Sequence, residues 1–316
     1  MTKKFMLLAA TAMLFAPSFA HAQDAAPAAS PSSSSGDPDP GVLRLGIGVN
    51  YSEGDYGDIE DTRVIAAPVS LKYSKGGFSV RVSVPFIQAD GPGSLIDTPG
   101  TADGSGGGSD DSGGDDSGSN SGSGSSGSNS GSSGSGSSGG SPNSGSVVTV
   151  PGGTSNKRSG MGDVSVTLGY SFGLSDRTFL DLTGRVKLPT ASQAKRLGTG
   201  EVDFSAGADL VQEFGPATFY IGGAHKFRGK PAGSTLRDTW SFAGGLSYRL
   251  PGRTMIGVDY DWQEASFLGN GPSSEVTGWV NFGLTRRVRM QLFASTGTNV
   301  DSTDFAAGLS LSVRLN

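Results

Sequence analysis

Apolar and polar side chains alternate with a period of two residues along most of the chain. Between residues 163 and 172, for example, Val164, Val166 and Leu168 alternate with Ser165 and Thr167. Because successive side chains of a β-strand point to opposite faces, this pattern predicts strands with one apolar and one polar face. Each such segment is close to the roughly 9–11 residues that a tilted strand needs to cross a hydrocarbon layer. The twelve segments span residues 42–51, 63–73, 77–88, 162–172, 178–188, 203–214, 217–227, 238–250, 254–262, 275–285, 289–297 and 304–315.

The connections between these segments alternate in length. Short turns such as Ser74-Lys75-Gly76 and Pro251-Gly252-Arg253 alternate with longer loops, the longest of which follows the third segment. Short turns at one end and long loops at the other are typical of outer-membrane barrels, whose two termini lie on the periplasmic side. The sequence therefore predicts an all-β fold, a single antiparallel transmembrane β-barrel of about 12 strands and of outer-membrane type.

A water-soluble β-sandwich would show the same alternation, so two further features matter. Aromatic side chains gather near both ends of the apolar faces, such as Tyr73 and Tyr170 towards the turns and Trp240 towards the loops. Such bands are expected at the two interfaces of a membrane. Charges near strand centres, such as Arg81 and Asp209, share the polar face, which suits a water-filled lumen better than a dry core.

The first 22 residues have the features of a cleavable secretory signal. Lys3 and Lys4 precede an apolar run that is too short to span a bilayer, and Ala20-His21-Ala22 supplies the small residues of a cleavage site. We expect cleavage near Ala22 and residence in the cell outer membrane. The remaining chain has 22 basic and 29 acidic side chains, a net charge of −7, which argues against nucleic acid as a partner. With no Cys, neither a lipid anchor on Cys nor a disulfide framework is available.

Two segments lack the alternation. Residues 23–40 are rich in Ala, Pro, Ser and Asp, and residues 102–146 are nearly all Gly and Ser. Neither segment can bury enough apolar surface to offset its ordering entropy, so both are predicted to be disordered. The predicted organisation is a signal peptide at 1–22, a periplasmic lead-in at 23–40, and a barrel at 41–316. Residues 102–146 form an extracellular loop of that barrel.

Three short motifs flank the fourth to sixth segments. They are Gly160-Met161-Gly162-Asp163, Lys187-Leu188-Pro189-Thr190 and Leu197-Gly198-Thr199-Gly200. Together, over residues 160–250, the chain resembles the outer-membrane transporter family grouped with meta-pathway phenol-degradation proteins. The resemblance implies a barrel that passes small, often aromatic or apolar compounds. Such a barrel has outer-membrane lipids and the barrel-assembly machinery as partners, although the final residues, Val313-Arg314-Leu315-Asn316, lack the terminal aromatic residue that this machinery often reads.

An enzymatic function is not expected. His225 is the one His that remains after the signal, and by parity with Phe219 and Ile221 it faces lipid, where a Ser-His dyad or His-Asp site cannot form. No catalytic residue, metal ligand set or cofactor is predicted.

Two non-enzymatic functions remain open. The first is a channel for small solutes, because charged linings select ions and polar solutes in pores and aromatic residues could line a path for ring-shaped ones. We also expect Arg81, Arg185 and Lys187 to form one positive patch that faces Asp209 and Asp259. Alternatively, the charges pair and plug the lumen and the aromatic residues fill space. The second function is a structural or surface barrel whose Gly/Ser loop is the functional part. The candidate lumen-lining residues are Lys72, Arg81, Asp181, Arg185, Lys187, Asp209, Glu213, Tyr220, Asp259, Trp279 and Phe293.

Overall fold

The computed structural model describes residues 41–55, 61–92, 94–95, 147–148 and 157–316. All of them belong to the compact unit Asp39–Asn316; a second unit comprises Met1–Pro38. The predicted signal peptide, lead-in and Gly/Ser loop lie outside the described residues.

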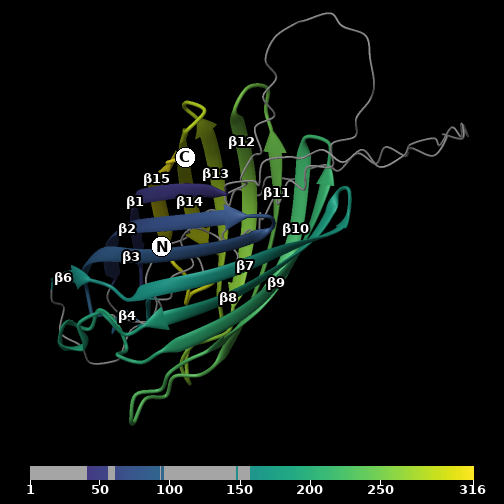
Figure 1. The fold of residues 1–316 in the computed structure, drawn as a ribbon. Helices are drawn as coiled ribbons and strands as arrows, with labels where there is room; N and C mark the ends of the chain where they lie inside the picture. Colours follow the sequence, from purple (N-terminus) through teal and green to yellow (C-terminus); the bar gives the residue numbers. More distant parts are fainter. Residues whose placement is uncertain (1–40, 56–60, 93, 96–146, 149–156) are drawn as a thin grey trace, which may run out of the picture. The chain divides into compact units, whose positions relative to one another are not determined.

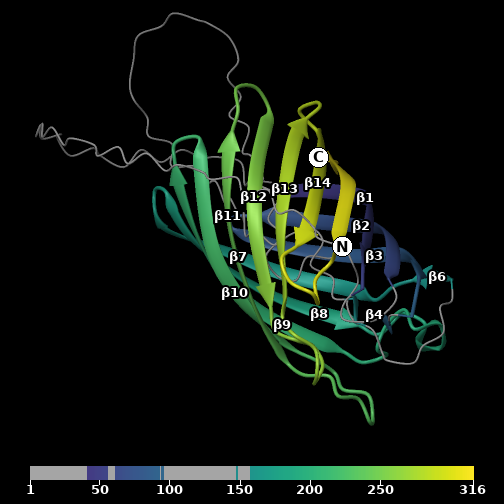
Figure 2. The same cartoon turned by 180° about the vertical axis from the view of Figure 1, so that it is seen from behind.

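Twelve long antiparallel strands make up the described fold, and each pairs with its neighbours along the chain. β1 also pairs with β15, from Arg44↔Arg314 to Glu53↔Phe305, so the sheet closes into a barrel (Figures 1 and 2). This confirms the predicted all-β barrel. The long strands are β1 Val42–Gly54, β2 Thr62–Lys75, β3 Phe78–Asp90, β7 Val164–Ser175, β8 Thr178–Leu188, β9 Asp203–Phe214, β10 Ala217–Phe227, β11 Thr239–Arg249, β12 Thr254–Gln263, β13 Ser273–Gly283, β14 Val288–Gly297 and β15 Phe305–Arg314.

Four short elements were not predicted. β4 (Ser94–Leu95) pairs with β5 (Val147–Val148), and a 3-10 helix, η1, spans Gln193–Lys195. β6 (Arg158–Met161) pairs with the last residues of β3, while β7 pairs with its first half. The break falls opposite Pro85, whose ring nitrogen carries no hydrogen and cannot donate to the ladder. The N–H of Gly162 donates to the Pro85 carbonyl at 2.9 Å across the break.

The two faces of the sheet differ in polarity. Large apolar side chains are exposed on the outward face, whereas the opposite face carries most of the buried polar and charged residues. An exposed apolar surface of this extent is stable in hydrocarbon and unfavourable in water. The exposed residues include Leu45, Ile47, Val49, Val69, Leu71, Val82, Leu168, Leu182, Leu210, Ile221, Leu246, Val258 and Leu292. No helix within the described ranges is long and apolar enough to cross a membrane.

Aromatic residues border this apolar surface at both of its ends. We call the end with the short connections, such as 214–217 and 249–254, the turn end, and the opposite end the loop end. The exposed aromatic residues at the turn end are Tyr73, Phe78, Tyr170, Phe172, Phe214 and Tyr248. Those at the loop end are Phe86, Phe204, Phe227, Trp240 and Tyr260. The two bands follow the distribution that the sequence predicted.

Asn316 strengthens the seam between β15 and β1. Its side-chain carbonyl accepts the N–H of Leu43 at 2.8 Å, and its amide donates to the Gly41 carbonyl at 2.9 Å. The N–H of Leu315 donates to the Leu43 carbonyl at 2.8 Å. The two ends of the sheet are therefore joined by side-chain as well as ladder hydrogen bonds.

Candidate functional site

The eleven predicted lumen-lining residues all lie on the face opposite the exposed apolar residues. Each side chain is buried or half-buried. Asp181, Arg185, Lys187, Asp209, Tyr220, Asp259 and Phe293 are buried, and Lys72, Arg81, Glu213 and Trp279 are half-buried. Their role in contact with a solute remains a prediction.

A row of cationic residues crosses the first five long strands. Arg44 is in register with Lys72, and Lys72 with Arg81. Thr167 of β7 then separates Arg81 from Arg185 of β8. Directly opposed side chains have Cβ atoms roughly 4.5–5.5 Å apart, so these positions form one basic row with Thr167 as its single uncharged member. Arg44 was missed as a candidate, although it shares the parity of the polar positions between Leu43 and Leu45.

Lys187 is not part of this basic row, so the predicted patch of Arg81, Arg185 and Lys187 is wrong for Lys187. Its Nζ lies 2.7 Å from Oδ2 of Asp203 and 3.4 Å from Oδ2 of Asp163, and all three side chains are almost fully buried. Asp203 is in register with Lys187, and Asp163 precedes the strand on its other side. Two carboxylates therefore flank this one cation at the loop end.

The three sequence motifs meet around this ion pair network. Thr190 Oγ1 accepts the N–H of Val164 at 2.9 Å and donates to the Gly162 carbonyl at 3.2 Å. The N–H of Ala191 donates to Oδ1 of Asp163 at 2.8 Å, and Lys187 donates to Thr199 Oγ1 at 3.2 Å. Residues 160–163, 187–191 and 197–203 thus form one structural unit, which we call the loop-end cluster.

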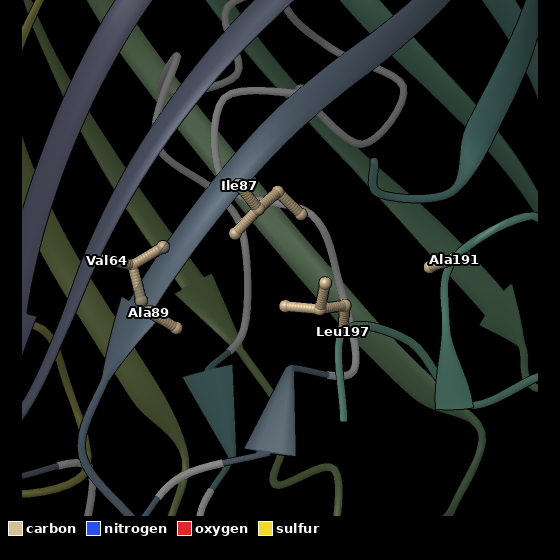
Figure 3. Close-up of a cluster of buried hydrophobic side chains, with 5 residues drawn as sticks. All are labelled: Val64, Ile87, Ala89, Ala191 and Leu197. Carbon is tan, nitrogen blue, oxygen red and sulfur yellow. The ribbon is translucent and has the colours of Figure 1, made fainter. Parts of the chain in front are cut away.

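The loop between β8 and β9 is held against β2 and β3 by apolar side chains. Ala191 and Leu197 of the loop pack with Val64 of β2 and with Ile87 and Ala89 of β3 (Figure 3). Leu197 is 1% exposed. A Cβ on Gly198 would lie 2.7 Å from Oδ2 of Asp163 and 2.9 Å from Cβ of Ala191, so only glycine fits there without a shift. The motifs therefore fix this loop on the polar face at the loop end.

A second group of side chains lies nearer the middle of strands β8 to β13. Asp181 and Asp209 are directly opposed in register. Asp259 and Tyr220 both lie over Gly245, because a Cβ there would be 2.2 Å from Asp259 Oδ1 and 2.4 Å from Tyr220 Cε1. We call Asp181, Asp209, Tyr220, Asp259 and Trp279 the carboxylate–aromatic cluster.

Trp279 completes this cluster from β13. Its indole N–H donates to Oδ2 of Asp259 at 2.7 Å, and its ring lies over Gly257, where a Cβ would be 2.3 Å from the ring. Glycines on neighbouring strands thus provide the space in which the rings lie flat against the sheet. Phe293 lies over Gly308 in the same manner, beside Asn50.

His225 packs outside this interior. Its ring contacts Phe227 and Trp240, with centroids 4.4 and 4.5 Å apart, in the aromatic band at the loop end. This agrees with the orientation that parity predicted. In the part of the chain that the structure describes, no group of three or more His, Cys, Asp or Glu side chains could hold a metal ion.

Asp238 closes the loop between β10 and β11, outside the membrane-spanning strands. It accepts the backbone N–H of Arg228 at 3.1 Å and forms an ion pair with Lys230 at 3.1 Å. The hydrogen bond from Arg228 and the nearby Lys230 hold the pKa of Asp238 below its usual range. The carboxylate is therefore stabilised in its charged form at neutral pH.

Solved structures with the same architecture are outer-membrane proteins. An outer-membrane channel from Pseudomonas putida F1 is similar with a TM-score of 0.56 and 12% identity, over 90% of this chain and 100% of that chain. The NanC porin is similar with a TM-score of 0.51 and 7% identity, over 86% of this chain and 100% of that chain. No family model and no curated protein matches the chain. The chain therefore has the fold of an outer-membrane β-barrel.

Proposed function

We propose that this protein is an outer-membrane channel that passes small solutes through the interior of its barrel. The observation that carries the proposal is the charge arrangement on the polar face of a closed sheet. The basic row lies on β1, β2, β3 and β8, whereas Asp259 lies on β12, six strands from β3 in the twelve-strand ring. Asp259 and the basic row on opposite walls create a transverse field that biases which solutes enter. Asp181 and Asp209 lie beside the row, on β8 and β9, so the expectation that Asp209 faces the row is wrong.

The class of solute follows from the aromatic residues on the same face. Tyr220, Trp279 and Phe293 share the polar face with the charged residues. Flat rings that lie against the wall offer apolar contact to ring-shaped solutes while leaving the charged groups to orient them. This supports the small aromatic solutes that the resemblance to the transporter family implies.

Permeation through the purified full chain in liposomes tests the proposal. We expect osmotic swelling with small sugars and amino acids, and none with protein-free liposomes. Deleting residues 104–144 should leave the swelling rate unchanged. If the protein inserts but passes no solute, the channel is excluded and the alternative, a structural or surface barrel, is favoured.

The basic row can be tested separately in planar bilayers. Arg185→Glu should reduce the preference for anions while the folded fraction stays the same, because it reverses one charge within the row. Arg177→Glu, at the exposed turn between β7 and β8, is the matched control and should not change selectivity. Unchanged selectivity in Arg185→Glu would show that the row does not face the permeation path.

A further inference from the structure

Three carboxylates of the carboxylate–aromatic cluster are buried without a paired cation. Asp181, Asp209 and Asp259 are 4%, 1% and 4% exposed. Oδ1 of Asp209 has no hydrogen-bond partner. Asp181 lies beside the Ser171 hydroxyl, and Asp259 beside the Tyr220 hydroxyl and the Trp279 indole N–H, but these neighbours are uncharged. Lys72 acts electrostatically on Asp181, but no described Lys, Arg or His forms an ion pair with any of the three. Because an unpaired buried charge is costly, this position favours a cation that comes from elsewhere.

Two of the three carboxylates, Asp209 and Asp259, flank one aromatic ring. A Cβ on Gly222 would lie 1.9 Å from Oδ1 of Asp209, so this carboxylate lies over β10, one register step from the Tyr220–Gly245 pair. Diagonal neighbours in a sheet are roughly 7–8 Å apart, which brings Asp209 and Asp259 to the two sides of Tyr220. Both carboxylates act electrostatically on the Tyr220 hydroxyl. Trp279 lies on the far side of Asp259, which accepts its indole N–H.

We propose that this cluster binds the ammonium group of a small aromatic amine. A primary ammonium has three N–H donors, which suit the carboxylate oxygens of Asp209 and Asp259, and a cation is attracted to the faces of Tyr and Trp rings. A metal ion is a poorer fit, because the described residues contain no group of three potential metal ligands. The aromatic body would lie against the rings of Tyr220 and Trp279. The inference rests on the proposed channel only in that the amine reaches the cluster through the barrel interior.

Binding of two isosteric probes to the full chain in detergent tests this site. Phenethylammonium chloride and 2-phenylethanol share the ring and chain length, and differ in having an ammonium or a hydroxyl group. Isothermal titration calorimetry at neutral pH should give at least tenfold tighter binding of phenethylammonium. Equal affinities for the two probes, or no binding of either, would overturn the proposal, as would full displacement of phenethylammonium by equimolar Ca²⁺.

Variants locate the site within the barrel. The double variant Asp209→Asn with Asp259→Asn should weaken phenethylammonium binding at least tenfold and leave 2-phenylethanol binding unchanged. Trp279→Phe keeps a ring but loses the donor to Asp259, and should weaken phenethylammonium binding two- to fivefold. Asp176→Asn is the control, since Asp176 lies exposed in the turn between β7 and β8, outside the candidate lumen-lining set.

The outcomes separate the site from the channel. Unchanged phenethylammonium affinity in the double variant would show that it binds elsewhere. If the double variant lacks the heat-dependent gel mobility of a folded barrel, the site is tested by the other two measurements. These are the affinity difference between phenethylammonium and 2-phenylethanol and the weaker phenethylammonium binding of Trp279→Phe. Binding without liposome swelling would contradict the channel and leave the site intact, whereas swelling without ammonium-selective binding would contradict the site alone.

Discussion

Buried carboxylates occur in two regions of this barrel, and the two regions differ in the partners that these carboxylates have. In the loop-end cluster, Asp163 and Asp203 share the Lys187 ammonium, and each accepts a backbone N–H, from Ala191 and Gly229. In the carboxylate–aromatic cluster, Asp181 and Asp209 face each other with no such partner. The same side chain at similar depth is therefore paired with a cation in one region and not in the other.

The difference indicates what each region does. A buried polar network with all its partners is rigid and specifies one arrangement, here the loop between β8 and β9. A buried carboxylate without a partner weakens the fold, and such sites cluster where a ligand supplies the missing charge. The loop-end cluster is accordingly structural, and we propose the carboxylate–aromatic cluster as the place for solute recognition.

Removing Lys187 should have the largest effect on stability. Lys187→Met leaves Asp163 and Asp203 buried without their cation, and breaking a buried ion pair costs about 3–5 kcal/mol. We expect the free energy of unfolding to fall by that amount, measured by urea titration of tryptophan fluorescence in detergent micelles. The triple variant Lys187→Met, Asp163→Asn, Asp203→Asn removes all three charges and should recover much of the loss. Equal stability of Lys187→Met and the parent would mean that the network does not hold the loop.

The space at Gly198 gives a smaller effect. Gly198→Ala places a methyl group against Asp163 and Ala191, and overpacking of this kind costs about 1–3 kcal/mol. Gly184→Ala on β8 is the control, because a Cβ there meets no atom within 4 Å. The control should be neutral or slightly stabilising, and the same urea titration measures both. A neutral Gly198→Ala would show that the motif glycine is not there for packing.

The sequence pattern predicted the twelve strands because alternation reports which face each side chain takes, and a closed sheet with an apolar outer face needs little else. Parity places Lys187 on the polar face but does not identify its partners. Those depend on the register with Asp163 and Asp203, and on the direction in which the side chain leans. The loop-end cluster was harder to predict, because Leu197 lies in a segment without alternation and packs on Ile87, which is over a hundred residues away. The glycines beneath Tyr220 and Trp279 could be found only once the neighbouring strands were aligned.

Chemically identical substitutions in the two regions should have opposite signs. Asp209→Asn removes an unpaired buried charge, and should raise the free energy of unfolding by about 1 kcal/mol, because burying a charge without a partner costs free energy that the neutral Asn largely avoids. Asp163→Asn removes the charged partner of the Lys187 ammonium and weakens the hydrogen bond from the Ala191 N–H to residue 163. We expect it to lower the free energy of unfolding by about 1–3 kcal/mol. Both are measured by urea titration without added amine. Added phenethylammonium should stabilise the parent and not Asp209→Asn, since a ligand that binds only the folded state raises its stability. If Asp209→Asn is instead destabilising to the same degree as Asp163→Asn, Asp209 has a structural partner and the contrast between the two regions fails.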